Sequence, residues 1–282
     1  MNDEIKYIET LGADFSDPDV RDYKIAKSSI PPVLPVSFEL SMPPVKSQGS
    51  VSSCVAHAIC LVAEYYANTQ HNFDDELSVG YIYGNRTLLT GMSEGMCTRY
   101  AIANFCSDGT PPKTYFPLHC EVPEIIDAVK EKKEQLHDTA TQFRFTSYVK
   151  VSSEEEIKTA LLAGSPIVIA VNWQKDMKVK NGKIHSEWKK KSGGHAMVLY
   201  GWTEEGWLIQ NSWGTNWGTK GTVIWPYDYP IRELYAIVDT ETSPLTIEKP
   251  HQATSAFGKW LIRVWNKIYA FAYKIYYKIV NK

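Results

Sequence analysis

The sequence predicts an α+β protein, because helical patterns fill its first half and short apolar strands fill its second half. The chain has 282 residues, of which 44% are hydrophobic and 22% are charged, the composition of an ordinary soluble globular protein. From residue 166 onwards, short apolar runs alternate with turns that contain Gly, Asn or Pro, as in antiparallel sheets. A helical unit beside a sheet unit predicts two lobes with a cleft between them.

The N-terminal part predicts an arm followed by a buried helix. Residues 1–40 are rich in Pro, Asp and Ser, which indicates an irregular arm. A polar turn over residues 47–53 leads to an apolar, Ala-rich run without a helix breaker over residues 54–67. Ser53 stands at the N-cap position. We therefore expect a largely buried helix that begins at or near Cys54.

The remaining elements follow in order. Short helical patterns alternate with a Gly-containing loop over residues 76–105, and residues 123–137 predict a charged surface helix. Another helix is expected over residues 154–163, opened by Ser152 or Ser153. The expected strands are residues 167–171, 196–200, 206–210, 221–225 and 234–238. The predicted organisation is an arm (1–40), a two-lobed domain (41–240, helical to about 120 and sheet from about 121), a linker (241–256) and a C-terminal helix (257–282).

The charge is unevenly distributed along the chain. The net charge is −2, which gives no bias toward nucleic acid, and we expect no nucleic-acid partner. Six of the 30 bases lie in residues 257–282, which contain no acid, so the rest has 24 bases against 32 acids. The start of the chain is acidic and lacks an apolar run, so we expect no signal peptide. Without an apolar stretch of membrane-spanning length, the expected location is the cytoplasm.

Cysteine usage points to free thiols rather than to disulfides or metal. An odd number of cysteines in a chain without a predicted signal peptide favours unpaired thiols, one of which could be catalytic. The five are Cys54, Cys60, Cys97, Cys106 and Cys120. They form no CxxC pair and no cluster with His at metal-ligand spacing, so we expect no metal.

Three residues could form a nucleophile with its base and an orienting amide. The start of a helix at Cys54 would favour the thiolate, because a helix N-terminus carries partial positive charge and free N–H groups. His195 follows two glycines, which allow close approach of another element, and leads into a strand. Asn211 ends the next strand, and antiparallel pairing could place its side-chain oxygen on the imidazole.

Three blocks of sequence together resemble the signatures of papain-like cysteine peptidases. They are the block from Gln48 to Cys54, the triplet 194–196 around His195, and the Asn-Ser-Trp-Gly block that starts at Asn211. Their order and spacing match that family over about residues 35–240, and the short arm resembles bacterial or phage-type members without a long pro-region. The resemblance implies a papain-like two-lobed fold and a cysteine endopeptidase that acts on peptides through a thioester, without a cofactor.

The resemblance also assigns roles to individual residues. Gln48 and the N–H of Cys54 would donate hydrogen bonds to the oxyanion. Trp213 would cover the hydrogen bond between His195 and Asn211, and Trp217 would line the leaving-group side. The implied substrate-binding residues are Gly95, Met96, Ala170, Gly194, Trp213 and Trp217. Among them, Gly95 would offer backbone to an extended substrate, and Met96 and Ala170 would wall the pocket for the second residue before the scissile bond.

Departures from the family pattern keep other interpretations open. Val51 stands in place of a cysteine that is usually disulfide-bonded, Val55 replaces a large aromatic residue, and His57 stands where a small or apolar residue is usual. A catalytically inactive papain-like protein used for binding or assembly is one alternative, and a transamidase with the same Cys–His pair is another. In the simplest reading, Cys54 is a buried structural thiol and His195 and the tryptophans are core residues. His57 could also compete as the base.

The tail over residues 257–282 predicts a long cationic amphipathic helix. Apolar residues recur at spacings of three and four, and most of the bases recur at a spacing of four on another face. Such a helix could lie on a membrane surface, or it could dock on the acidic body or on another protomer. A third possibility is a partner-binding segment.

Overall fold

The computed structural model describes residues 10–16, 19, 22–26, 33–86, 94–188, 191–239 and 247–248. The predicted tail (257–282) and most of the predicted linker (241–256) lie outside these residues. No helix in the described part of the chain is both long enough and apolar enough to cross a bilayer.

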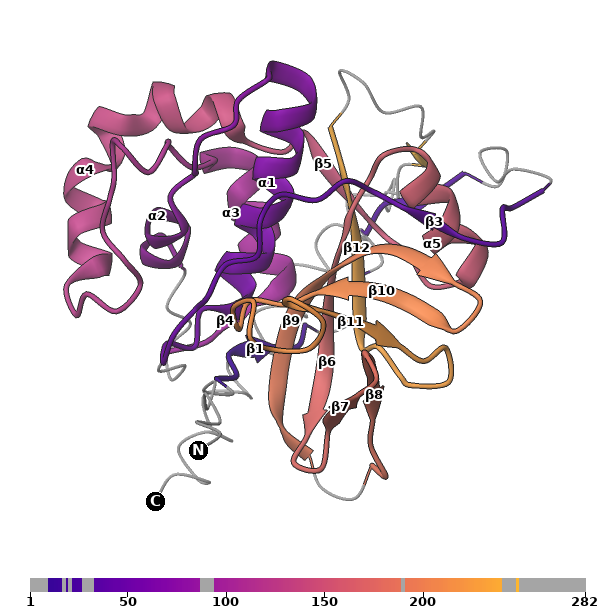
Figure 1. Cartoon of the computed structure of the whole chain (residues 1–282). Helices are drawn as coiled ribbons and strands as arrows, with labels where there is room; N and C mark the ends of the chain where they lie inside the picture. The colour runs from indigo at the N-terminus through magenta and orange to yellow at the C-terminus, as the bar shows by residue number, and fades with distance from the viewer. Residues whose placement is uncertain are drawn as a thin grey trace, which may run out of the picture.

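Four helices form one half of the molecule, on the left of Figure 1. They are α1 (Cys54–His71), α2 (Val79–Gly84), α3 (Thr98–Asp108) and α4 (Ile125–Ala140). Helix α1 begins at Cys54 as predicted, and its residues 54–67 are all buried. It ends at His71, and the next residue, Asn72, takes the left-handed conformation that closes many helices (φ 50°). Because α1 also contacts the sheet, it forms the centre of the molecule.

Helix α4 corrects the predicted limit of the helical half. The sequence suggested that the sheet lobe starts at about residue 121, but α4 packs on α2. Its buried residues Ile125 and Val129 meet the backbone of α2 at Gly84, where an added Cβ would lie 2.5 Å from Val129 Cγ2. Helix α4 therefore has a buried apolar stripe opposite its charged surface, and this stripe packs it against α2 in the helical half.

The other half is a sheet of nine strands, most of them antiparallel, on the right of Figure 1. The order is β5-β12-β6-β9-β10-β11-β8-β7, and β3 pairs with β9 beside this path. The strands are β3 (Phe38–Glu39), β5 (Ser147–Lys150), β6 (Ile167–Gln174), β7 (Lys178–Lys180), β8 (Lys183–His185), β9 (Lys191–Thr203), β10 (Gly206–Gln210), β11 (Thr222–Trp225) and β12 (Glu233–Val238). All five predicted strands are present, whereas β3, β5, β7 and β8 carried no clear apolar signal.

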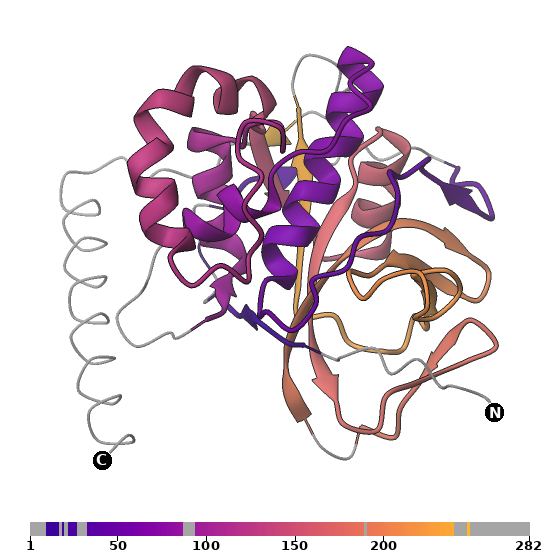
Figure 2. The same cartoon turned by 60° about the vertical axis from the view of Figure 1, so that its left-hand side comes forward.

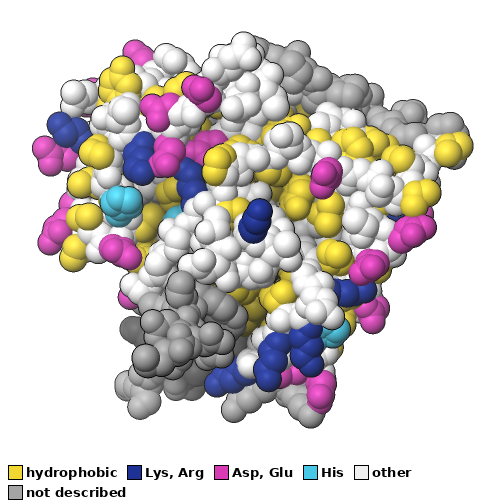
Figure 3. All heavy atoms as spheres, in the orientation of Figure 1, with side chains coloured by type: hydrophobic (Ala, Val, Ile, Leu, Met, Phe, Trp, Pro, Cys, Tyr) yellow, Lys and Arg dark blue, Asp and Glu magenta, His cyan; other side chains and the backbone are white. Residues whose placement is uncertain are grey.

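Helix α5 (Glu154–Leu162) packs against β6 and β9 of the sheet. The side chain of Ser153 accepts from the N–H of Glu156, and Glu156 caps the Ser153 backbone in return. This capping box confirms Ser153, one of the two predicted residues, as the start of the helix. On the face in Figure 3, acidic and basic side chains are mixed over the helices, and lysines gather over the β7–β8 hairpin.

The N-terminal arm contains three two-residue strands. Strand β1 (Ala13–Asp14) pairs in parallel with β4 (Met96–Cys97) and contacts β9. Strand β2 (Lys24–Ile25) pairs with β13 (Ile247–Glu248), and β3 joins the large sheet. Figure 2 shows β1, in indigo, passing between the helical half and the sheet. The arm therefore crosses the junction of the two lobes.

Candidate active site

Cys54 is the first residue of α1 and is fully buried between the two halves. The backbone N–H groups of Ala196 in β9 and of Gly12 in the arm lie near its sulfur and lower the pKa of the thiol. Ser53 occupies the N-cap position but makes no capping bond; its hydroxyl contacts His57 Nδ1 at 3.2 Å instead. Burial raises the pKa of the Cys54 thiol to about 11, and the N–H groups oppose this only in part. In the arm-covered chain, the helix N-terminus therefore does not produce the expected thiolate.

His195 and Asn211 meet as the sequence predicted. His195 Nε2 lies 2.8 Å from Asn211 Oδ1, which also accepts from the N–H of Ser212 at 2.7 Å. Since an amide oxygen only accepts, Nε2 is assigned the proton and Nδ1 the lone pair. Nδ1 is buried and has no hydrogen-bond partner among the described residues, Cys54 included. Burial lowers the pKa of His195 to about 4, so thiol and imidazole are both neutral near pH 7 in this state.

Three tryptophans enclose the imidazole. Trp213 stacks on His195 with ring centres 4.4 Å apart and an interplanar angle of 26°. Trp217 meets Trp213 edge to face at 5.6 Å. Trp173 of β6 contacts both His195, at 5.4 Å, and Trp213, at 4.8 Å, and the sequence alone did not single it out. The three rings exclude water from the bond between His195 and Asn211.

Gln48 is held in one orientation by a neighbour of Asn211. Its Oε1 accepts from the hydroxyl of Ser212 at 2.6 Å, and its backbone N–H donates to the Ser212 carbonyl at 2.8 Å. The side-chain Nε2 donates to the carbonyl of Thr10, an arm residue, at 3.1 Å and to that of Val51 at 2.9 Å. The predicted oxyanion donor is therefore already bound to a peptide carbonyl, and that carbonyl belongs to the arm.

The arm also occupies the backbone positions expected to bind an extended substrate. The N–H of Gly12 donates to the Gly194 carbonyl at 3.0 Å, and the Gly12 carbonyl accepts from the N–H of Met96 at 2.9 Å. At Gly194, an added Cβ would lie 1.8 Å from the Ala13 carbonyl oxygen. At Gly95, it would lie 2.8 Å from the Gly12 carbonyl oxygen. Gly95, Met96 and Gly194 are therefore brought together around an extended segment of the chain itself.

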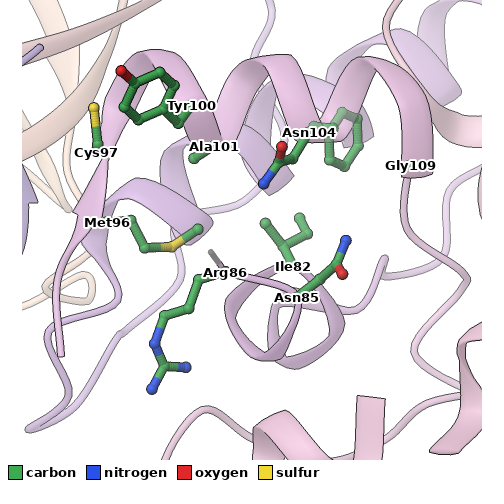
Figure 4. Close-up of a pocket in the computed structure, with 10 residues that line it drawn as sticks. Ile82, Asn85, Arg86, Met96, Cys97, Tyr100, Ala101, Asn104 and Gly109 are labelled. Atoms are coloured by element: carbon green, nitrogen blue, oxygen red, sulfur yellow. The ribbon is translucent and has the colours of Figure 1, made fainter. Parts of the chain in front are cut away.

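The two predicted pocket walls differ in their surroundings. The backbone N–H of Met96 faces the arm, while its side chain lines a cavity of about 20 Å³ between α2 and α3 (Figure 4). That space holds little more than a water molecule. Ala170 is fully buried in β6, where it pairs with Ala196 of β9 on one side and with Glu233 of β12 on the other.

His57 lines a small cavity together with Asn211, but its ring makes different hydrogen bonds. Its Nδ1 contacts the Ser53 carbonyl oxygen at 3.0 Å, and burial lowers its pKa to about 4. It lines a cavity of about 460 Å³ together with Lys46, Gln48, Lys113 and residues 76–80 and 118–121. Its ring nitrogen is thus bound to the N-terminal turn of its own helix.

The chain is similar to known proteins in sequence and in fold. The family model described as papain family cysteine protease matches residues 37–228. An uncharacterized peptidase C1-like protein of Acanthamoeba polyphaga mimivirus is 27% identical over 82% of this chain and 83% of its own length. A viral cathepsin of Adoxophyes honmai nucleopolyhedrovirus is 26% identical over 67% of this chain and 56% of its own length.

Solved structures show the same fold. Xylellain, a cysteine protease from Xylella fastidiosa, superposes with a TM-score of 0.66 at 23% identity, covering 83% of this chain and 98% of its own. Procathepsin B S9 from Trypanosoma congolense superposes with a TM-score of 0.59 at 15% identity, covering 85% and 86%. These similarities confirm the predicted α+β fold with a helical lobe and a sheet lobe.

Proposed function

The chain belongs to the papain family of cysteine peptidases, and from this membership we propose that it hydrolyses peptide bonds with Cys54 as the nucleophile. The observation that carries the proposal is the 2.8 Å hydrogen bond between His195 Nε2 and Asn211 Oδ1. It leaves Nδ1 as the proton acceptor of a ring whose neighbouring residue, Ala196, has its backbone N–H near the Cys54 sulfur. Nucleophilic catalysis requires a base that a third group orients, and here that base would take the proton of the thiol.

The reaction would proceed in two acyl transfers. His195 Nδ1 takes the thiol proton, and the sulfur attacks the peptide carbonyl to form a tetrahedral oxyanion. Gln48 Nε2 and the N–H of Cys54 donate to that oxyanion; each donor of this kind contributes about 10²–10³ in rate. The imidazolium then protonates the leaving amine, and a thioester remains on Cys54. Water, deprotonated by His195, hydrolyses the thioester and regenerates the thiol.

The arm bears on when this reaction can occur. The carbonyl of Thr10 accepts the hydrogen bond of the Gln48 side chain. Gly12 lies near the Cys54 sulfur, and its backbone bonds to Gly194 and Met96. A peptide cannot use these groups until the arm leaves them. We therefore propose that the arm-covered chain is inactive, with a neutral thiol and a neutral imidazole, and that displacement of residues 10–16 opens the site.

The test is cleavage of a peptide library by three variants of the full chain: wild type, Gly12→Ala and the double variant Gly12→Ala/Cys54→Ala. We expect the Gly12→Ala chain to cleave and the double variant not to. Cleavage that survives Cys54→Ala would exclude Cys54 as the nucleophile. No cleavage by an opened chain would favour the inactive binding or assembly protein. Added amines that appear in the products would favour the transamidase.

Location and tail contacts form a separate part of the proposal and rest on the sequence. We propose that the chain is cytoplasmic and that residues 257–282 bind either an anionic membrane or a protein surface. The six bases of that segment support both contacts. Flotation with anionic liposomes, with and without residues 257–282, separates the two. If only the chain that contains residues 257–282 floats with the liposomes, the segment binds the membrane. If neither chain floats, the result supports docking on protein.

A further inference from the structure

We propose that the hairpin of β7 and β8 is a docking surface for an acidic, extended segment of a protein substrate. Its lysines are exposed or half-exposed and are called the hairpin patch here: Lys175, Lys178, Lys180, Lys183 and Lys220. The substrate part of the proposal rests on the proposed function, whereas binding of an acidic segment to the patch requires no catalysis. None of the catalytic steps uses these residues.

Positive charge is concentrated in this part of an otherwise acidic body. Residues 175–191 contain seven of the 24 bases and two of the 32 acids that precede the tail, a net charge of +5. The rest of residues 1–256 then has 17 bases against 30 acids. Lysine side chains gather over the hairpin in Figure 3. A local excess of one sign on a body of the other sign attracts partners by charge complementarity.

The strand register places the basic side chains on one face of the hairpin. Three pairs of residues oppose each other: Lys178 with His185, Val179 with Ile184, and Lys180 with Lys183. Opposed residues share a face, and successive residues of a strand alternate between faces. Ile184 is fully buried and Val179 packs against the core. The other two pairs, which hold the lysines, therefore face outward together.

This arrangement is unfavourable for the isolated chain. Lys180 lies directly opposite Lys183, and like charges at opposed positions destabilise a pair of strands. Lys183 has one acid near it, Glu205, at 3.8 Å. The other four lysines of the patch form no ion pair among the described residues. Elsewhere, lysines have an acid within 3.1 Å, as at Lys113, Lys130, Lys133 and Lys158.

Protection of a sheet edge explains only part of the patch. Strand β7 is the last strand of the sheet order, and lysines on edge strands prevent unwanted pairing. That role accounts for Lys178 and Lys180, which lie on β7. Lys175 precedes β7, and Lys183 lies on β8. Lys220 comes from another loop, whose Thr219 Oγ1 would lie 2.9 Å from a Cβ added at Gly182 in the hairpin turn.

The hairpin connects the two strands that hold the catalytic histidine. Val171 of β6 opposes His195 of β9, and Gln174, the last residue of β6, opposes Lys191, the first residue of β9. Four residues of strand, about 13 Å, therefore separate His195 from the end of the ladder where Lys175 follows. The arm passes over this end, because a Cβ added at Gly193 would lie 3.0 Å from Leu11 Cδ1. A peptide in the cleft would thus reach the patch about four residues from the cut.

The leaving-group side of the cut is the side that faces the patch. The resemblance to papain-like peptidases places Trp217 on the leaving-group side, and Trp173, near the end of β6, contacts Trp217 at 6.4 Å. We therefore expect the acidic segment to begin about four residues after the scissile bond. Its backbone could pair with the outer edge of β7, as extended peptides do at other sheet edges.

A protein segment fits the patch better than an anionic membrane does. The outward face of β7 is only three residues long, about 10 Å, which is the length of a short extended peptide. Exposed acids flank the patch: Glu187, Glu204 and Glu205. A flat anionic surface would bring these acids against lipid headgroups of the same charge, whereas a peptide can pass between them.

The first experiment measures binding without catalysis. Fluorescence anisotropy compares labelled hexaglutamate with labelled hexaglutamine on three full chains: wild type, Lys178→Glu/Lys180→Glu, and the matched control Lys130→Glu/Lys132→Glu on α4. Three surface ion pairs correspond to about a 3- to 100-fold change in affinity. We expect the hairpin variant to bind hexaglutamate weaker by that factor and the control to bind it like wild type. Thermal unfolding of the hairpin variant should not be lowered, because the change removes opposed like charges.

The second experiment measures substrate selection in the Gly12→Ala chain. One peptide that this chain cleaves is extended by four Glu or four Gln residues, beginning at the fourth residue after the cut. We expect kcat/KM to be about 3- to 100-fold higher with the Glu block, and the ratio to fall to one or below after Lys178→Glu/Lys180→Glu. The same Glu block placed before the cut should give no gain, and the α4 variant should keep the preference.

Four results would overturn the inference. Unchanged hexaglutamate binding by the hairpin variant would place the acidic segment elsewhere, for example on residues 257–282. An equal loss in the α4 variant would mean that net charge alone matters. Flotation with anionic liposomes that falls in the hairpin variant, without hexaglutamate binding by wild type, would assign the patch to a membrane. Cleavage that ignores the Glu block would remove the role in substrate selection. Absence of all cleavage would refute the proposed function, and hexaglutamate binding would then still support the docking surface.

Discussion

Adding one methyl group at Gly12 should open the active site. A Cβ built on Gly12 would lie 2.1 Å from the carbonyl oxygen of Ser52 and 2.6 Å from its carbonyl carbon. Both atoms are backbone in the turn that leads directly into the buried start of α1, so the arm is the element that must move. We therefore expect Gly12→Ala to expel the arm while the two lobes stay folded.

The magnitude follows from the contacts that the arm would lose. They are the bond from Gly12 N–H to Gly194 at 3.0 Å, the bond from Met96 N–H to Gly12 at 2.9 Å, and the bond from Gln48 to Thr10 at 3.1 Å. Each neutral hydrogen bond contributes about 0.5–1.5 kcal/mol. Three of them correspond to about 1.5–4.5 kcal/mol, which raises the open population about 10- to 10³-fold.

The assay is the rate at which a thiol-directed epoxide alkylates Cys54 near neutral pH, followed by peptide mass mapping of all five cysteines. The rate at Cys54 should rise by the same factor of about 10 to 10³ in Gly12→Ala. Ala13→Gly, which removes an atom from the adjacent arm residue instead of adding one, is the matched control and should react like wild type. If Cys54 in Gly12→Ala reacts no faster than in wild type, the arm does not control access and the reasoning is wrong.

Three further predictions concern orientation, protonation and stability. In the opened chain, Asn211→Ala should lower kcat by up to about 10²-fold with a smaller change in KM, because the imidazole loses its orienting acceptor; steady-state kinetics test this, and an unchanged kcat would contradict it. Alkylation of Cys54 in the covered chain should rise with pH toward about 11, since burial favours the neutral thiol, and the profile should move to lower pH in Gly12→Ala; identical profiles would count against desolvation by the arm. Lys46→Met should destabilise the fold by about 3 kcal/mol in urea unfolding, because Glu64 is buried and accepts from Lys46 Nζ at 2.6 Å; a loss below 1 kcal/mol, or no recovery with Glu64→Gln, would contradict this.

The start of α1 and the main strands could be predicted because their signals are local. An apolar run that follows a polar turn identifies Cys54 as a helix start, and alternating apolar runs and turns identify strands. His195 and Asn211 came together because β10 pairs antiparallel with β9 and its end, followed by Asn211, lies beside the part of β9 that contains His195. The predicted fold class is confirmed, and the prediction for this pair agrees with the geometry.

The path of the arm could not be predicted, because its contacts are long-range and its strands have two residues each. Pairing of Ala13 with Met96, and the fit of Gly12 against Ser52, leave no periodic trace in the sequence. The pKa of the Cys54 thiol in the arm-covered chain is raised, whereas the sequence predicted that it would be lowered. The helix N-terminus could be recognised in the sequence, but burial under the arm could not. Trp173 was missed because it reaches His195 from β6, whose sequence is that of an ordinary buried strand.

The central claim is that the sulfur of Cys54 forms the bond to substrate. The most direct measurement is to mix the Gly12→Ala chain with an activated ester substrate, quench in acid within the first turnover, and locate the acyl group by mass spectrometry. We predict one acyl group per chain on Cys54 and none in Gly12→Ala/Cys54→Ala. Substrate turnover without an adduct on Cys54, or an adduct on another cysteine such as Cys120, would contradict the claim.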